Sequence, residues 1–267
     1  KSSLVAVTAG LLVSNTPPSD RSALKKQSLL SIGAGRTTLC EVEIRSPQPG
    51  DESTIGLLIQ PKNKSEMDLL IRQWAEDEWR RRQPGLLSRM GADTLPTPTE
   101  VARALAAMTG YSEYSQVLRD ASGASRPRTV RPLDEIVPQY TTHEELTEHL
   151  RSRCRLNERN QTAWWWPSTK NQPDSLQELK DVVEAINLGK QADACLPDRI
   201  TLIIPKILPD IAQTLDLRLQ VIDTRGLDAG VGLPGRADLQ SFASDPRAIL
   251  VLCTPFKAAP GDAVRSL

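Results

Sequence analysis

The sequence predicts an α/β protein in which a mixed sheet is interrupted by a large, mostly helical insertion. Two observations lead to this prediction. Short apolar segments of the kind that form strands occur near both ends of the chain, at 38–45, 54–61, 198–205, 217–224 and 247–256. The middle of the chain, 65–190, instead repeats its apolar residues at the spacing of an α-helix. Strand-forming flanks around a helical middle are typical of a sheet with an inserted helical block.

The individual elements follow from local signals. A helix is predicted over 2–14, because Pro17 and Pro18 stop it. Segment 38–45 alternates apolar and polar residues as a half-buried strand does, and it is expected to pair with 54–61 in antiparallel fashion. Four helices are expected in the middle, at 65–82, 99–110, 142–159 and 175–190. Ser65 and Thr99 are their predicted N-caps, and Gly110 is predicted to close the second.

Two further segments of the middle region are interpreted from composition. The proline-rich stretch 121–139 is taken as a linker between helices. The three consecutive tryptophans at 164–166 favour a hydrophobic anchor for the insertion over a platform for stacking a base or a partner.

Composition narrows the class of protein. The 267 residues include 33 basic and 33 acidic side chains, so no nucleic acid partner is indicated and a membrane partner stays undetermined. Four cysteines without a C-x-x-C pair and only two histidines disfavour a zinc site, and they favour a reduced, cytoplasmic protein. No apolar run approaches the ~20 residues of a membrane span. The apolar N-terminal stretch lacks an A-x-A cleavage site, so it is not interpreted as a signal peptide.

The first candidate motif is KSSL at 1–4. A phosphate-binding loop ends in Gly-Lys-Ser/Thr and leads into a helix whose N-terminal amides favour anions. The residues after Lys1 and Ser2 are predicted to be helical, as that motif requires. The tetrapeptide alone carries little information, because it occurs by chance in many proteins.

The second candidate is the glycine-rich segment GAGRTTLCEVEIR at 33–45. It is not the phosphate loop itself, since the first glycine of G-x-x-x-x-G-K-[ST] would fall on Leu30 and a strand rather than a helix follows Thr38. A switch segment fits better, in which a threonine hydroxyl ligates Mg²⁺ and the loop becomes ordered around a γ-phosphate. An ordinary glycine turn before a strand is the alternative.

The third candidate is LRLQVIDTRGLD at 217–228. An apolar strand ends there at Asp223, and Gly226 follows in the pattern D-x-x-G. In P-loop NTPases an aspartate at the end of a strand holds Mg²⁺, and a glycine amide reaches the γ-phosphate. The alternative is a plain turn, because Asp and Gly are common turn residues.

Taken together, KSSL, GRTTLCEVEIR and VIDTRGLD resemble the nucleotide-binding motifs of dynamin-like large GTPases, which are P-loop NTPases. Gly35, Thr38 and Cys40 stand at the positions of the family's switch segment, and DTRGLD is similar to its D-T-P-G-L, with Arg225 in place of the proline. The WWWPSTK stretch is similar to a W-P element of some distant large GTPases. The resemblance covers the motifs and the core strands, and it does not extend to the helical insertion.

The resemblance implies a role for each matching residue. Lys1 would contact the β- and γ-phosphates, and Ser2, Thr38 and Asp223 would hold Mg²⁺, Asp223 through water. Lys1, Thr38 and Asp223 would form the catalytic set, while Ser2, Ser3 and Gly226 would join Lys1 in binding GTP or ATP.

Other positions near these motifs bear on catalysis. Leu227 stands where Ras-like GTPases have a water-orienting glutamine, so another group would have to position the water. Arg36 and Arg225 are either charge stabilisers or solvated surface residues.

The resemblance also implies a domain organisation and a function. Residues 1–62 and 196–267 would be parts of the nucleotide-binding domain, and 63–195 would be the helical insertion, which explains the long gap between Thr38 and Asp223. The expected function is a Mg²⁺-dependent nucleoside triphosphatase that acts as a switch or assembly module, with a protein partner or self-association through the insertion. No [NT]-K-x-D follows Asp223, so the choice between GTP and ATP stays open, with GTP favoured. The alternative is a degenerate P-loop fold that serves as a non-catalytic scaffold.

Overall fold

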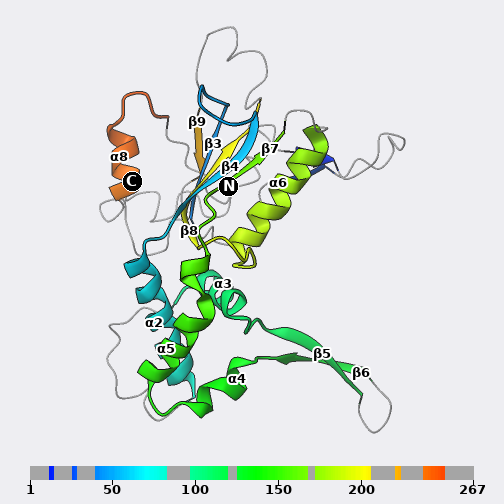
Figure 1. The fold of residues 1–267 in the computed structure, drawn as a ribbon, viewed down its shortest axis with the longest axis vertical. Coiled ribbons are helices and arrows are strands. Elements are labelled where there is room, and N and C mark those ends of the chain that lie inside the picture. Colours follow the sequence, from blue (N-terminus) through cyan, green and yellow to red (C-terminus); the bar gives the residue numbers. More distant parts are fainter. Residues whose placement is uncertain are drawn as a thin grey trace, which may run out of the picture. The chain divides into compact units, whose positions relative to one another are not determined.

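The computed structural model describes residues 12–14, 26–28, 40–82, 97–119, 125–167, 172–205, 220–223 and 237–249. These segments contain a five-stranded sheet, two separate two-stranded ladders and several helices (Figure 1). The α/β class predicted from the sequence is therefore confirmed. No helix in the described part of the chain combines the length and the apolar character needed to cross a bilayer.

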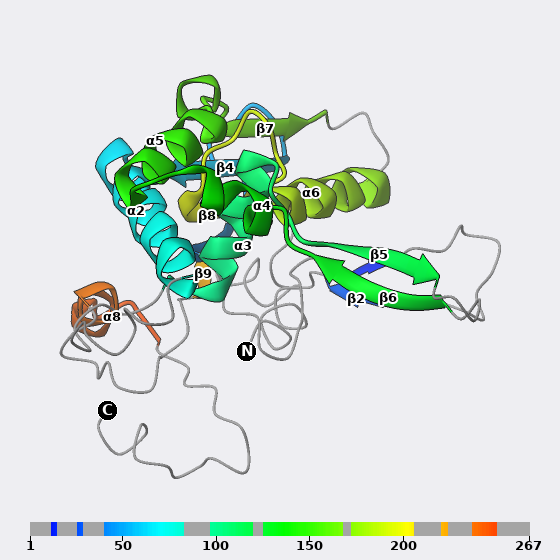
Figure 2. The ribbon, with the colours of Figure 1, turned by 90° about the horizontal axis from the view of Figure 1, so that it is seen from below.

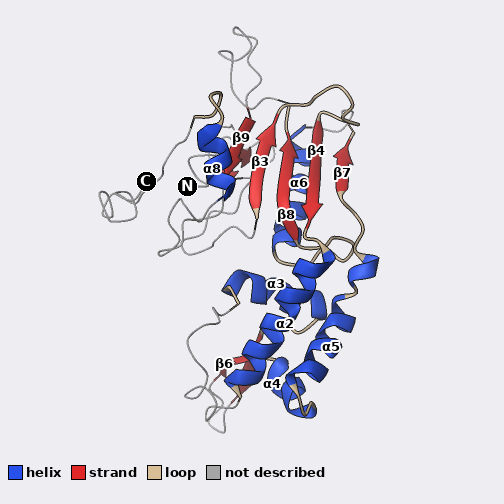
Figure 3. Cartoon of the chain, turned by 90° about the vertical axis from the view of Figure 1, so that its left-hand side faces the viewer, coloured by secondary structure: helices blue, strands red, loops and turns tan. Residues whose placement is uncertain are grey.

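The five-stranded sheet has the order β7-β4-β8-β3-β9 (Figure 3). Its strands are β7 (Ala163–Trp166), β4 (Ile55–Pro61), β8 (Pro197–Ile203), β3 (Glu41–Arg45) and β9 (Gln220–Asp223).

Strand directions in this sheet are mixed. β3 and β9 are antiparallel. The amide of Ile204, just after β8, donates to the carbonyl of Arg45 at the end of β3, as expected when those two strands run in parallel. The amide of Lys62, just after β4, donates to the carbonyl of Leu196, just before β8, so β4 runs the opposite way.

The predicted pairing of 38–45 with 54–61 is wrong. β3 and β4 follow one another in the chain, but β8 lies between them in the sheet. Both strands are mostly buried and each pairs on two sides, β3 with β8 and β9, and β4 with β8 and β7. The alternation of residues predicted two strands correctly but could not identify their neighbours.

The N-terminal prediction also needs a correction. The predicted helix over 2–14 ends in a strand, because β1 (Leu12–Ser14) pairs antiparallel with β2 (Lys26–Ser28). A β-ladder supplies hydrogen-bond partners from a distant segment, which local helix signals cannot anticipate. The residues before Leu12 lie outside the described part of the chain.

The chain divides into two compact units, while the predicted division at 62 and 195 into a nucleotide-binding domain and an insertion stays a prediction. The first unit contains Lys1–Gly56, Trp165–Gln177 and Ile200–Leu267, and the second contains Leu57–Trp164 and Glu178–Arg199. The boundaries fall inside β4, β7 and β8, so these strands belong partly to each unit.

The second unit contains most of the helices. They are α2 (Lys64–Arg81), α3 (Thr99–Thr109), the short α4 (Leu133–Ile136), α5 (His143–Cys154) and the larger part of α6 (Gln172–Asn187), with 3-10 turns at Val137–Gln139 and Leu156–Glu158. α8 (Ala237–Ser244) belongs to the first unit.

Capping residues set where α2 and α5 begin. Asn63, rather than the predicted Ser65, forms a capping box with Glu66, and Thr142 forms one with Glu145. At α3 the N-cap position is Pro98, so the predicted Thr99 is the first helical residue. Gly110 closes α3 in the left-handed conformation, as predicted.

The helices of the second unit pack through a shared apolar core. α2 contributes Met67, Ile71 and Trp74, which are almost completely buried, and α5 contributes Leu146 and Leu150. These positions recur every three or four residues, so each helix presents one apolar face to the other. Burying side chains of this size is worth about 1.5–3 kcal/mol each, which makes this pair of helices the stable centre of the unit.

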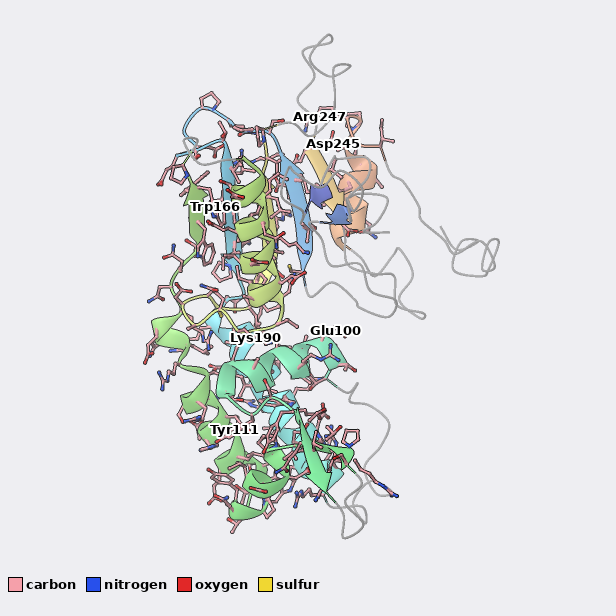
Figure 4. All side chains as sticks on the ribbon, turned by 90° about the vertical axis from the view of Figure 1, so that its right-hand side faces the viewer. Glu100, Tyr111, Trp166, Lys190, Asp245 and Arg247 are labelled. Carbon is pink, nitrogen blue, oxygen red and sulfur yellow. The ribbon has the colours of Figure 1, made fainter. Side chains whose placement is uncertain are left out.

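Two glycines permit close backbone contacts. Gly56 in β4 lies against the ring of Trp165 in β7, where an added Cβ would come within 2.4 Å of the ring. Gly189, just after α6, has φ +67, and a Cβ there would come within 2.2 Å of the Ala104 carbonyl oxygen in α3. Trp166, next to Trp165, is 7% exposed (labelled in Figure 4), whereas Trp164 and Trp165 are half-buried, and a role as anchor of an insertion stays a prediction.

One antiparallel ribbon was not predicted. β5 (Tyr114–Arg119) and β6 (Ser125–Val130) pair over their full length, and Figures 1 and 2 show the ribbon extending away from α3 and α4 of the same unit. β6 lies inside 121–139, which was interpreted as a linker. Arginine, proline and serine are poor strand formers, so only the pairing with β5 makes this segment a strand.

Candidate functional site

The candidate site lies where β9 ends beside the beginning of β3. Asp223 is the last residue of β9, at the strand tip where the sequence placed it, and only 2% of it is exposed. In the antiparallel ladder Asp223 stands opposite Val42, and Ile222 stands opposite Glu43. Directly opposite residues share a face of a sheet, so Asp223 lies on the same face as Val42 and Ile44. The carboxylate therefore stands at the end of an otherwise apolar face.

The antiparallel register places the first residues of β3 at the end of the sheet where β9 ends. β9 ends at Asp223 and β3 begins at Glu41, so the chain that leads into β3 enters the sheet at the end where Asp223 stands. In the sequence, Thr38 precedes Val42 by four positions. This arrangement results from long-range strand pairing and could not be deduced from the spacing of the motifs.

The other predicted site residues lie outside the described part of the chain. They are Lys1, Ser2, Ser3, Thr38 and Gly226. Their roles in binding phosphate and Mg²⁺ remain predictions, as does the catalytic role of Asp223.

Within the described residues, no three His, Cys, Asp or Glu side chains gather to hold a metal ion. The predicted magnesium ligands are instead two hydroxyl groups, those of Ser2 and Thr38, and the carboxylate of Asp223, and both hydroxyl groups lie outside the described residues.

The opposite face of β3 carries buried carboxylates that sequence reasoning missed. Glu41 and Glu43 are each only 8% exposed, and the hydroxyl of Thr201 in β8 donates to Glu43 over 3.3 Å. An alternating strand normally exposes its polar face to water, and nothing in the sequence E-V-E-I-R distinguishes a covered polar face from a solvated one. Only the packing of the sheet reveals that β3 is buried on both sides.

The far end of β3 is held by an ion pair. The Arg45 guanidinium donates two hydrogen bonds to the Asp51 carboxylate, at 2.7 and 2.9 Å, and the Gln48 amide donates to the same carboxylate over 2.7 Å. The bond from Arg45 holds the pKa of Asp51 below its usual range. The pair closes the loop after β3, at the end opposite Asp223.

A second group of polar side chains lies in the second unit, at the C-terminal end of α3. The Tyr111 hydroxyl and His149 Nε2 are 2.7 Å apart, and the Tyr140 ring lies 5.1 Å from the imidazole (Tyr111 is labelled in Figure 4). The Arg153 guanidinium lies over the Tyr111 ring at 5.5 Å. Burial and, to a smaller extent, the charge of Arg153 lower the pKa of His149, so the imidazole is neutral near pH 7.

The buried thiols of the described residues are poor nucleophiles. Cys154 and Cys195 are free, and burial raises the pKa of both, that of Cys154 to about 12. Nucleophilic cysteines are thiolates with a depressed pKa and partial exposure. The adjacent Arg159 donates to the backbone carbonyls of Cys154, Gln191, Ala194 and Met108, and it thus connects the segment after α5, the segment after α6 and the end of α3. This cluster has a structural role.

Comparisons with protein-family models, with curated proteins and with solved structures find no match to this chain.

Proposed function

We propose that this chain is part of the nucleotide-binding domain of a Mg²⁺-dependent nucleoside triphosphatase of the dynamin-like type, with GTP favoured over ATP. The observation that supports the proposal most directly is the register of β3 and β9. It pairs Asp223, in its D-x-x-G motif, with Val42, four positions after Thr38. A magnesium site of the P-loop type needs a carboxylate and a switch hydroxyl at the same end of the sheet.

In the proposed site each residue has one task. Lys1 neutralises the β- and γ-phosphates, and the Ser2 and Thr38 hydroxyls ligate Mg²⁺. Asp223 accepts hydrogen bonds from water on the metal, and the amide of Gly226 donates to the γ-phosphate. The burial of Asp223 fits this task, because a carboxylate in an apolar environment interacts more strongly with a dication than a solvated one does.

Hydrolysis requires a positioned water molecule. Leu227 cannot orient it, since an aliphatic side chain has no hydrogen-bonding group. The missing donor would come from a partner or a second copy, which makes turnover dependent on assembly. The protein would then act as a switch in a reducing, cytoplasmic setting, consistent with the free thiols of Cys40, Cys154 and Cys195.

One observation favours a second candidate, a non-catalytic scaffold with a degenerate P-loop fold. The β5–β6 ribbon is exposed on both faces, as expected for a surface that binds another protein. A scaffold would retain the fold and the ribbon but would not hydrolyse nucleotide.

The test is Mg²⁺-dependent binding and hydrolysis of GTP and of ATP by the full-length protein, compared with Asp223→Asn. This substitution keeps the shape of the buried side chain and removes its charge. Loss of an outer-sphere carboxylate is expected to reduce metal affinity or turnover by about 10–100-fold. Glu43→Gln is the matched control, because it neutralises a buried carboxylate on the neighbouring strand that lies on the opposite face. Equal activity of Asp223→Asn and wild type would refute the assigned role, and no binding of either nucleotide would leave the scaffold candidate.

A further inference from the structure

The β5–β6 ribbon is a regular ladder without a covering layer. Every side chain described in it is exposed except that of Val130, which is half-buried, and Tyr114 and Val117 are 54% and 65% exposed. An isolated two-stranded ribbon is only marginally stable in water, and it gains stability from a third strand or a packed face. The described residues of this chain supply neither.

The base of the ribbon, in contrast, is firmly attached. Arg131, which directly follows β6, donates to both carboxylate oxygens of Glu78 in α2, at 3.2 and 3.3 Å, and also to Glu113 just before β5. Tyr111 contacts His149 three residues before β5 begins. Hydrogen bonds thus fix the residues on both sides of the ribbon, and the ribbon projects from them.

The two edges of the ribbon differ. Pro127 has no N–H and stands opposite Val117, so its nitrogen has to face the outer edge of β6 rather than β5. In an antiparallel ladder the opposite residue then also directs its N–H and C=O outward, which places those of Val117 on the outer edge of β5. The edge of β6 is blocked by a proline, and the edge of β5 is open to a further strand.

The two faces of the ribbon differ as well. The register places Tyr114, Gln116, Arg126 and Arg128 on one face, and Ser115, Val117, Pro127 and Thr129 on the other. Four arginines and one aspartate occur between positions 114 and 131. Of the arginines, Arg126 and Arg128 stand on the first face, Arg119 stands on the second face opposite Ser125, and Arg131 follows the ladder.

We infer that the outer edge of β5 binds an extended, acidic segment of a partner protein as a third strand. Main-chain hydrogen bonds along Ser115 and Val117 would provide affinity, and acidic side chains on the first face would interact with Arg126 and Arg128 across Gln116. Arginine and glutamate side chains together span two strand spacings of about 4.8 Å each. The inference specifies the partner binding proposed above, on which it rests, but it does not require nucleotide hydrolysis.

Charge argues against other occupants. A nucleic acid or an anionic membrane presents a broad negative surface, which would also meet the exposed carboxylates of Glu113 and Asp134 at the base of the ribbon.

The experiment measures binding of a labelled, end-blocked peptide of alternating valine and glutamate to the full-length protein by fluorescence anisotropy, with and without Mg²⁺ and GTP. The same peptide with lysine in place of glutamate, an oligonucleotide duplex and phosphatidylserine vesicles are the comparison ligands. We expect the glutamate peptide alone to bind, with affinity falling as salt rises.

Matched variants distinguish the contribution of the β5 edge to peptide binding from the contribution of the arginine charges. Val117→Pro removes the outward N–H of β5 and is expected to weaken binding at least about tenfold, whereas Thr129→Pro makes the same change on the blocked edge of β6 and is expected to have no effect. Arg126→Glu with Arg128→Glu is expected to abolish binding, and Arg72→Glu, on the exposed side of α2, to leave it intact. Circular dichroism checks folding.

Several results would overturn the inference. They are no binding of the glutamate peptide by the wild-type protein, equal binding of the lysine peptide, tighter binding of the duplex or the vesicles, and equal effects of the two proline variants. If the wild-type protein binds the peptide but neither nucleotide, the ribbon inference stands and the proposed catalytic function fails.

Discussion

Two antiparallel strand pairs of this chain, β3–β9 and β5–β6, have the same local geometry and opposite surroundings. In β3, four of the five residues are buried, and β9 ends in the buried Asp223. In the β5–β6 ribbon the described side chains are almost all exposed. A ladder of backbone hydrogen bonds contributes little net stability by itself, because water satisfies the same groups in the unfolded chain. Burial of the faces stabilises β3–β9, and attachment at the base stabilises β5–β6.

The largest expected effect is a loss of core packing in β3. Ile44→Ala should lower the free energy of unfolding by about 2–5 kcal/mol, because the side chain is fully buried and its removal leaves a cavity. Val117→Ala, which truncates a β-branched side chain in the ribbon, should change it by less than about 0.5 kcal/mol. Urea unfolding of the two variants measures the contrast. Equal losses would mean that the ribbon is as well packed as the sheet.

A smaller effect is expected at the base of the ribbon. Arg131→Gln removes two hydrogen bonds to the carboxylate of Glu78, which is almost completely buried. Because Glu78 keeps Arg81 as a second partner, we expect the free energy of unfolding to fall by about 1–3 kcal/mol. Burial already raises the pKa of Glu78, and the loss of Arg131 should raise it further.

Hydrogen exchange locates the effect of this substitution. Amides of β5 and β6 should exchange faster in Arg131→Gln while those of β3 do not change. Arg155→Gln, which changes an exposed arginine with a long ion pair to Glu158, is the control and should leave both ladders unaffected. Faster exchange in β3 as well would show that the two ladders unfold together.

The smallest expected effect depends on pH. The pKa of His149 is lowered in the folded protein by burial and by Arg153, so the folded state favours the neutral imidazole. Stability from this group is present above the unfolded pKa near 6.5 and is lost as pH falls toward the lower folded value.

Two measurements test this dependence. The protein has only two histidines, so NMR titration can follow His149 beside the exposed His143. His149→Gln should flatten the decline in stability between about pH 7 and 5. A His149 pKa at or above that of a model peptide would contradict the structure around Tyr111.

Local signals in the sequence determined the secondary structure wherever a single segment carries its own pattern. The strands at β3, β4, β8 and β9, the helices α2, α3, α5 and α6, and the stop at Gly110 follow from periodicity and capping chemistry, which act within a few residues. The position of Asp223 at a strand tip was predictable for the same reason.

Tertiary structure alone decided which segments lie side by side. The insertion of β8 between β3 and β4, the strand formed by the proline-containing β6, and the burial of Glu41 and Glu43 all depend on partners far away in the chain. The register that pairs Val42 with Asp223 likewise depends on residues far apart in the chain. Hydrophobic burial and strand pairing are favourable between residues that are far apart in the chain. Local patterns in a single sequence do not identify which of these residues will be in contact.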